Sequence, residues 1–199
     1  TGQPFEFGAA DVLLYDNIAL LGRQFISDGY YNLLSAFYNA GNHIALSDSG
    51  YPIYLSCIYW IFDDSILMTR ILKALWSAWT CVLLYKLARR NFGEVIGRTS
   101  AIFCLLMPNL IYYCGLHLKE TEMVFLIVLF VERLDFAVRS AKINWQSLIT
   151  ALIVGGILFM FRTALAAVAM IALAVTLMLS SKKVLSLSRK IAIGTFVVI

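Results

Sequence analysis

The stretch that decides the fold is His117-Leu118-Lys119-Glu120-Thr121-Glu122, a charged segment between two apolar runs. Residues 99–114 precede it and residues 123–131 follow it, and both runs have the composition of membrane-bound helices. A charge at the centre of a bilayer costs roughly 2.5–3.5 kcal/mol even on the mildest scale. The segment must therefore lie at a membrane face or line a wet cavity, and we interpret it as one wall of an active site. The alternative is a helix start, because Glu120 and Glu122 would favour the positive end of the helix that follows.

The composition is that of an integral membrane protein. Of the 199 residues, 61% are hydrophobic and 14% are charged, whereas soluble domains contain about 45–50% apolar and 25% charged residues. The net charge of +4 follows from membrane topology, as argued below, and we expect no nucleic-acid partner. The sequence starts at Thr1 without a methionine and ends at Ile199 in an apolar run, so we expect a piece of a longer protein.

Residues 1–65 are predicted to form a large external loop with helices that lie along the membrane. Residues 11–26 carry apolar side chains at 14, 18, 21 and 25 and charged ones elsewhere, which predicts an amphipathic surface helix. A short helix is expected within residues 30–39. Residues 51–62 are strongly apolar, but they fall short of the roughly twenty residues that a span needs. We therefore place this helix at the interface as well.

Residues 66–199 are predicted to form a transmembrane helical bundle with about five full spans and the start of a sixth. The spans are expected at 66–87, 96–114, 123–136, 147–161 and 164–179, and the sixth begins at 191. Pro108 predicts a kink in the second span. The predicted fold class is an all-α integral membrane protein, a multi-span bundle with interfacial juxtamembrane helices in its first external loop.

Basic residues gather in alternate connections between these helices. Eleven of the sixteen lysines and arginines lie in three connections, at 86–98, 133–142 and 182–190. The positive-inside rule makes these connections cytoplasmic. Residues 115–122 and the turn at Arg162 then lie on the external side, together with the acidic first loop. This topology requires that residues 51–62 do not cross the membrane.

Several motifs, in order along the chain, resemble lipid-linked-sugar glycosyltransferases of the GT-C fold. They are Ala10-Asp11-Val12-Leu13-Leu14-Tyr15, then Gly50-Tyr51-Pro52, then Arg70-Ile71-Leu72-Lys73-Ala74-Leu75 with residues 83–93, and finally Met107-Pro108 followed by Tyr112-Tyr113 and an acid at 120–122. The pattern is similar to that of aminoarabinose transferases and protein O-mannosyltransferases, which are family-39-like glycosyltransferases. The paired Asp-Glu of that family is here Asp11-Val12, and no basic residue stands just before Pro52.

The resemblance implies transfer of a sugar from a polyprenyl-phosphate donor to an acceptor hydroxyl or amine. The lipid-linked donor and membrane lipids are the expected partners. The Lys119-Glu120-Thr121 triplet also occurs in bacterial polysaccharide-assembly relatives, which favours a use of that kind. We expect a bacterial inner (plasma) membrane, and the charge distribution places the active face on the external, periplasmic side. The alternatives are a polysaccharide polymerase or ligase, a non-catalytic scaffold, and a transporter or flippase. A transporter should show ionisable residues in mid-span and inverted repeats, and neither is evident in the sequence.

Acidic residues are candidates for the base that takes the proton of the acceptor. The resemblance points to Asp11, with Tyr15 four positions later as a substrate contact; the other interpretation of Asp11 is a helix cap. Glu120 and Glu122 diverge by about 200° on a helix, so at most one points into the site, and either is a catalytic candidate. Asp48 is a candidate substrate contact. A divalent cation held by Asp11 and Asp48 is a further hypothesis.

Basic residues are candidates for stabilising the phosphate that leaves. We expect this role for Lys119, Arg162 and Arg70, and arginine can bind phosphate through two parallel hydrogen bonds. The other interpretation of these side chains, and of Lys73, is that they extend to lipid headgroups. His117 has no partner that the sequence reveals, and we expect it at the surface or in the interfacial belt.

Overall fold

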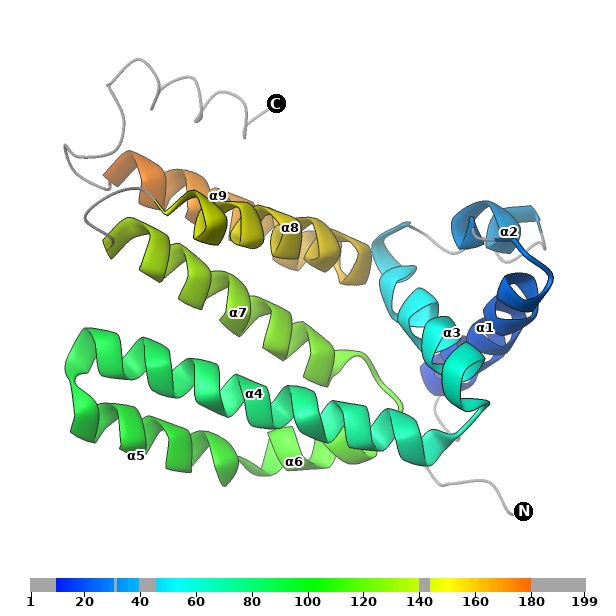
Figure 1. Cartoon of the computed structure of the whole chain (residues 1–199), viewed down its shortest axis with the longest axis horizontal. Coiled ribbons are helices and arrows are strands. Elements are labelled where there is room, and N and C mark those ends of the chain that lie inside the picture. Colours follow the sequence, from blue (N-terminus) through cyan, green and yellow to red (C-terminus); the bar gives the residue numbers. More distant parts are fainter. Residues whose placement is uncertain (1–9, 31, 40–45, 140–143, 180–199) are drawn as a thin grey trace.

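The computed structural model describes residues 10–30, 32–39, 46–139 and 144–179, which are helical throughout their regular elements, with no strand among them. The expected start of a sixth span at 191 lies outside these residues. Three α-helices of the N-terminal part come first: α1 (Ala10–Ser27), α2 (Leu33–Asn39) and α3 (Gly50–Phe62). They gather at one end of a layer of long helices, α4 (Ile66–Phe92) to α9 (Thr163–Leu179), as Figure 1 shows. We call the end where α1, α2 and α3 gather the cavity end. The opposite end, where Gly93 joins α4 to the next helix, is called the Gly93 end.

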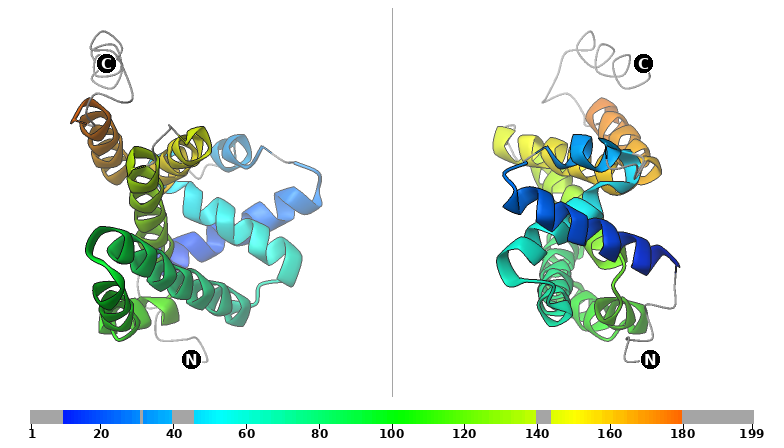
Figure 2. Two further views of the ribbon diagram at one scale, coloured as in Figure 1. Left: turned by 60° about the vertical axis from the view of Figure 1, so that its left-hand side comes forward. Right: turned by 90° about the vertical axis from the view of Figure 1, so that its right-hand side faces the viewer.

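α3 is a strongly apolar helix that packs against α1 (Figure 2). Its buried side chains recur at helical spacing and include Tyr51, Leu55, Ile58 and Tyr59. Asp63 ends the helix with a left-handed backbone (φ 57°) and forms an ion pair with Arg23 of α1. The predicted helix at 51–62 is therefore present. One of its faces packs within the protein, whereas Trp60, Ile61 and Phe62 are exposed.

The amphipathic helix predicted at 11–26 is also present as α1, and its buried face agrees with the predicted one at Ile18 but is rotated away from Leu14. The buried side chains are Val12, Tyr15, Ile18 and Ala19, whereas Leu14 is 52% exposed. The face is rotated because α1 approaches α3 through Gly22, where an added Cβ would lie 2.0 Å from Ser56 Oγ. Close backbone approach at a glycine therefore sets the crossing of the two helices.

α4 and α5 (Glu94–Leu105) form an antiparallel pair. The hydroxyl of Ser65 accepts a hydrogen bond from Met68 N–H at 3.4 Å and caps the start of α4. Gly93 ends the helix at φ 93°, a conformation that glycine adopts readily. With 27 residues at 1.5 Å each, α4 is about 40 Å long, enough to cross a bilayer.

The number of spans remains a prediction. By length and composition α4 alone could cross a membrane among the described helices, or two crossings result if α5 and α6 (Pro108–Gly115) count as one bent span. These two helices bend by 45° at a break next to Pro108, the residue expected to kink this segment. α7 (Glu120–Arg139) carries several charges, and α8 (Trp145–Phe161) and the apolar part of α9 are shorter.

A buried polar contact joins α1, α3 and the connection before α7. The Tyr59 hydroxyl donates to Asp16 Oδ1 at 2.7 Å and lies 3.1 Å from His117 Nε2. Because its proton is engaged by Asp16, the hydroxyl oxygen accepts from the protonated Nε2 of a neutral imidazole. His117 is 2% exposed and its ring stacks on Tyr59, so the expectation of a surface histidine is wrong. Burial, with the nearby charges of Lys73 and Arg70, lowers the pKa of His117 to about 4.

We predict that His117 makes folding stability depend on pH. The unfolded chain binds a proton at a pKa near 6.5 and the folded protein only near 4, so the free energy of unfolding falls as pH drops from about 6.5 to 4. The loss should be about 3 kcal/mol, from about 1.4 kcal/mol for each pH unit. Melting curves in detergent between pH 7 and 4 test this against His117→Gln, which lacks this titration. Equal pH dependence in both proteins would contradict the prediction.

Candidate functional site

A cavity of about 480 Å³ opens at the cavity end, between α1, the turn before α3, the segment before α7, and the junction of α8 with α9. Its ionisable lining residues are three acids and two bases, namely Asp11, Asp48, Glu120, Lys119 and Arg162. Tyr15, Leu14 and Thr163 also line it. Segments separated by more than a hundred positions therefore present opposite charges to one space.

Lys119 is held at the edge of this cavity by α1 and by the turn before α3. Its ammonium group forms an ion pair with Asp48 and lies 5.4 Å from the centre of the Tyr15 ring. Burial lowers the pKa of Lys119, but its hydrogen bonds to Asp48 and Tyr15 outweigh burial, so the pKa is raised and the side chain stays charged. Lys119 is 8% exposed, which argues against the alternative interpretation that it extends to lipid headgroups.

Arg162 reaches the cavity because α8 stops one residue before α9 begins. Its backbone is extended (φ −166°, ψ 111°) between Phe161 and Thr163, and its N–H still bonds to the Leu158 carbonyl at 2.8 Å. The side chain is exposed and forms no ion pair with another described residue. A single-residue helix break thus delivers an arginine whose guanidinium is open to a ligand.

The acids of the cavity differ in their surroundings. Asp11 lies in the first turn of α1 and is exposed. Glu120 begins α7, and its Oε2 is buried with no hydrogen-bond donor among the described residues. A buried carboxylate oxygen without a donor is costly, and a ligand hydroxyl in the cavity would supply one.

Two residues expected in the site lie elsewhere. Glu122 does not line this cavity; its side chain points to a second cavity and toward Lys73, 3.6 Å away. This agrees with the divergence expected of Glu120 and Glu122. Arg70 lies on α4, does not line the cavity, and acts on the His117 ring through its charge.

The second cavity is apolar and lies beside the first. Its volume is about 320 Å³, and it is lined by aromatic and aliphatic side chains of α3, α4, α7 and α8, including Tyr54, Trp76, Phe125, Ile157 and Met160. Phe161 lines it while the adjoining Arg162 lines the first cavity. The two spaces therefore adjoin, one polar and one apolar.

A layer of buried side chains beneath the polar cavity escaped prediction. Tyr51, Lys73 and His117 are each at most 2% exposed. The Tyr51 ring contacts those of Tyr15, His117 and Phe161 with centroids 5.3, 6.2 and 6.4 Å away. The signal available was Lys73 itself, a lysine within an apolar helix. Only contacts between distant segments bury it.

Asp11 and Asp48, the residues of the metal hypothesis, both line the polar cavity. Within the described ranges, however, no three His, Cys, Asp or Glu side chains lie close enough to hold a metal ion.

Comparison with known proteins identifies the family. The model of the dolichyl-phosphate-mannose-protein mannosyltransferase family matches residues 51–199, well over half of the chain. No curated protein and no solved structure matches. The match contains Lys119, Glu120 and Arg162, while Asp11 and Asp48 precede it. Members of this family are integral membrane glycosyltransferases of the GT-C type. The chain belongs to the dolichyl-phosphate-mannose-protein mannosyltransferase family, as its resemblance to protein O-mannosyltransferases led us to expect.

Proposed function

We propose that this protein transfers a sugar from a polyprenyl-phosphate donor to an acceptor hydroxyl or amine in the polar cavity. The observation that carries the proposal is the cavity lining, which joins carboxylates to Lys119 and Arg162 in one space. A carboxylate must take the proton of the acceptor, and a positive charge must stabilise the phosphate that leaves. The oxygen of the acceptor forms the new bond to the sugar, the bond from sugar to phosphate breaks, and polyprenyl phosphate departs.

Asp11 is the proposed base. It is exposed at the start of α1 and faces the same space as Arg162, so its carboxylate is accessible to an incoming hydroxyl. Glu120 is the second catalytic carboxylate in the proposal, because its Oε2 lacks a donor among the described residues and can accept a hydrogen bond from the acceptor or the sugar.

Arg162 and Lys119 are the proposed phosphate contacts. Arg162 has no carboxylate partner among the described residues, so its planar guanidinium can bind two phosphate oxygens. Lys119 is already paired with Asp48, and it contributes a fixed positive charge at the cavity wall. Tyr15 and Asp48 hold that lysine and complete the substrate-binding surface.

The apolar cavity is the proposed site for the first isoprene units of the donor. It adjoins the polar cavity at Phe161 and Arg162, and its lining is almost wholly apolar. A donor phosphate beside Arg162 would place its lipid chain against Phe161 and Ile157. Van der Waals contacts with the aromatic lining favour this placement, since the lipid chain comes from the bilayer and not from water.

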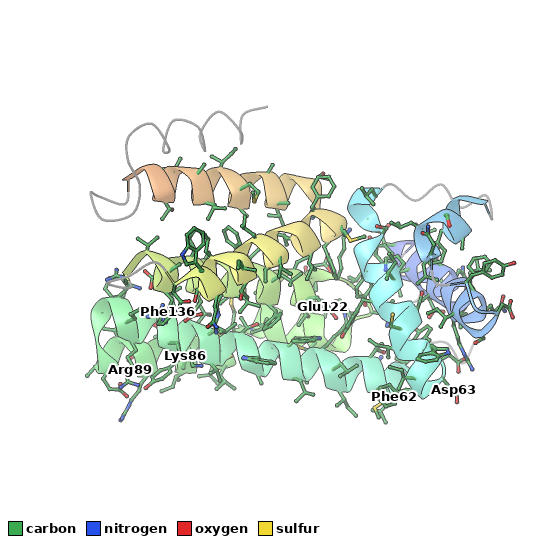
Figure 3. All side chains as sticks on the ribbon, turned by 45° about the horizontal axis from the view of Figure 1, so that its top comes forward. Phe62, Asp63, Lys86, Arg89, Glu122 and Phe136 are labelled. Atoms are coloured by element: carbon green, nitrogen blue, oxygen red, sulfur yellow. The ribbon has the colours of Figure 1, made fainter. Side chains whose placement is uncertain are left out.

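The proposed active face is external, which is the periplasmic side in a bacterial inner membrane. The basic Lys86 and Arg89 lie at the end of α4 away from Phe62 and Asp63, as Figure 3 shows. The positive-inside rule assigns that basic end to the cytoplasm. The cavity, which lies at the other end, would then open outward.

We predict that Asp11→Asn abolishes sugar transfer while leaving the protein folded. Loss of a general base reduces turnover by about 10²–10⁴-fold. The measurement is formation of labelled product in vesicles supplied with radiolabelled mannosyl polyprenyl phosphate, with the melting temperature in detergent as the test of folding.

The matched control is Asp28→Asn, which removes an exposed acid beyond the other end of α1. We expect it to keep wild-type turnover. Unchanged turnover in Asp11→Asn would refute the assigned base, and inactive wild-type protein with every lipid-linked donor would favour the scaffold or flippase alternatives.

We predict that Ile157→Trp weakens binding of long-chain donors. The indole ring would fill part of the apolar cavity and raise the donor KM about tenfold, equivalent to about 1.4 kcal/mol. A donor with a short isoprenoid chain should show an unchanged KM. Val168→Trp is the control, because Val168 lies on α9, is 65% exposed, and does not line the cavity. An equal change for both chain lengths would contradict the placement of the lipid chain.

A further inference from the structure

Lys73 is fully buried although it lies in the apolar helix α4. Its Nζ lies 3.6 Å from Glu122 Oε2 and 5.1 Å from the centre of the Tyr51 ring. It also donates a hydrogen bond to the carbonyl oxygen of Leu118. Three contacts from three different elements therefore converge on one ammonium group.

Lys73 is the basic partner of Glu122 among the residues that the structure describes. Glu122 is 4% exposed, and neither of its carboxylate oxygens accepts a hydrogen bond from the described residues. Figure 3 shows Glu122 between the two ends of the bundle, nearer to α3 than to Lys86 and Arg89. A buried ion pair with few hydrogen bonds contributes little stability, because desolvation offsets the attraction. Stability alone is therefore a weak explanation for the pair.

The position of the bound carbonyl suggests another explanation. Leu118 directly precedes Lys119 and Glu120, and all three line the polar cavity. A hydrogen bond to the Leu118 carbonyl fixes the peptide from which Lys119 projects toward Asp48. Glu122 keeps the ammonium group in place from the first turn of α7, two residues after Glu120.

We propose that Lys73 and Glu122 form a buried positioning pair that holds the segment 118–120 at the polar cavity. The inference rests on the proposed function of that cavity. Neither residue lines the polar cavity where the sugar phosphate is proposed to bind, and Glu122 borders the apolar cavity. Lys73 acts through the Leu118 carbonyl on Lys119, and Glu122, a catalytic candidate by sequence, orients Lys73.

The test replaces the pair by apolar residues of similar size, Lys73→Met with Glu122→Leu. Removing both charges leaves no unpaired charge in the interior, so the double variant should melt at or above the wild-type temperature. Its KM for mannosyl polyprenyl phosphate should rise about tenfold, with a smaller change in kcat. A wild-type KM in the folded double variant would overturn the proposal.

A comparison with Lys119→Gln shows whether Lys73 acts through Lys119. Lys119→Gln should raise the donor KM by itself, and adding the double substitution should change it little further, since the segment then has no lysine to place. If the two changes raise the donor KM independently, so that their effects multiply, Lys73 does not act through Lys119 and the proposal is overturned. The matched control is Arg90→Met with Glu132→Leu, which removes the ion pair at the Gly93 end and should leave the donor KM unchanged.

Glu122→Gln decides the question if the double variant does not fold. Glutamine keeps the size of glutamate and an oxygen that can accept from Lys73, so positioning predicts KM and kcat within about twofold of wild type. Loss of kcat by two orders of magnitude or more would make Glu122 a catalytic carboxylate and overturn the proposal. Asp11→Asn measured in parallel distinguishes failure of the proposed function from failure of this inference. Unchanged turnover in Asp11→Asn contradicts the proposed function. Reduced turnover in Asp11→Asn together with a wild-type donor KM in the folded Lys73→Met, Glu122→Leu variant contradicts only this inference.

Discussion

Removing an ionised side chain from water costs free energy unless a partner of opposite charge is nearby. This requirement determines which segments pack together at the end of the bundle where α1 and α3 lie. Lys119 leaves water against Asp48 and the face of Tyr15. Lys73 does so against Glu122 and the Leu118 carbonyl. Each pair joins segments far apart in the sequence, so satisfying these charges ties the first loop and α4 to the segment before α7. The polar cavity forms where these ties converge.

The helices supply the rest of the geometry by where they stop. α8 ends one residue before α9, which exposes Arg162. α3 begins at Gly50, where a Cβ would press on Phe161 and Met160, and so the turn that carries Asp48 lies beside the α8–α9 junction. The opposite end contains a different ion-pair network, centred on Arg90, Glu132 and Asp135. Family membership identifies a glycosyltransferase, and in the proposed function the lipid chain and the sugar phosphate of the donor meet at the border of the two cavities.

Much of this arrangement could be predicted from sequence because it depends on local signals. Apolar spacing and length identified α1, α3 and the long helices, and Pro108 marked the break before α6. Basic residues gather in alternate connections between the helices, and this pattern singled out Lys119 and Arg162 in the remaining connections. The structure brings both residues to one cavity. The buried face of α1 was predicted less well, since Gly22 and its contact with Ser56 decide it. Burial of Lys73 and His117 could not be predicted, because it arises from partners more than forty positions away.

The proposed orientation places the polar cavity and the Gly93 turn on opposite sides of the membrane. Its most direct test uses protein whose native cysteines are replaced by serine and which carries a single new cysteine, Thr163→Cys at the cavity or Val95→Cys beside Gly93. A membrane-impermeant maleimide is then added to intact cells. The account predicts that Thr163→Cys is labelled at once and Val95→Cys only after the membrane is permeabilised. Labelling of both variants from the same side would contradict it.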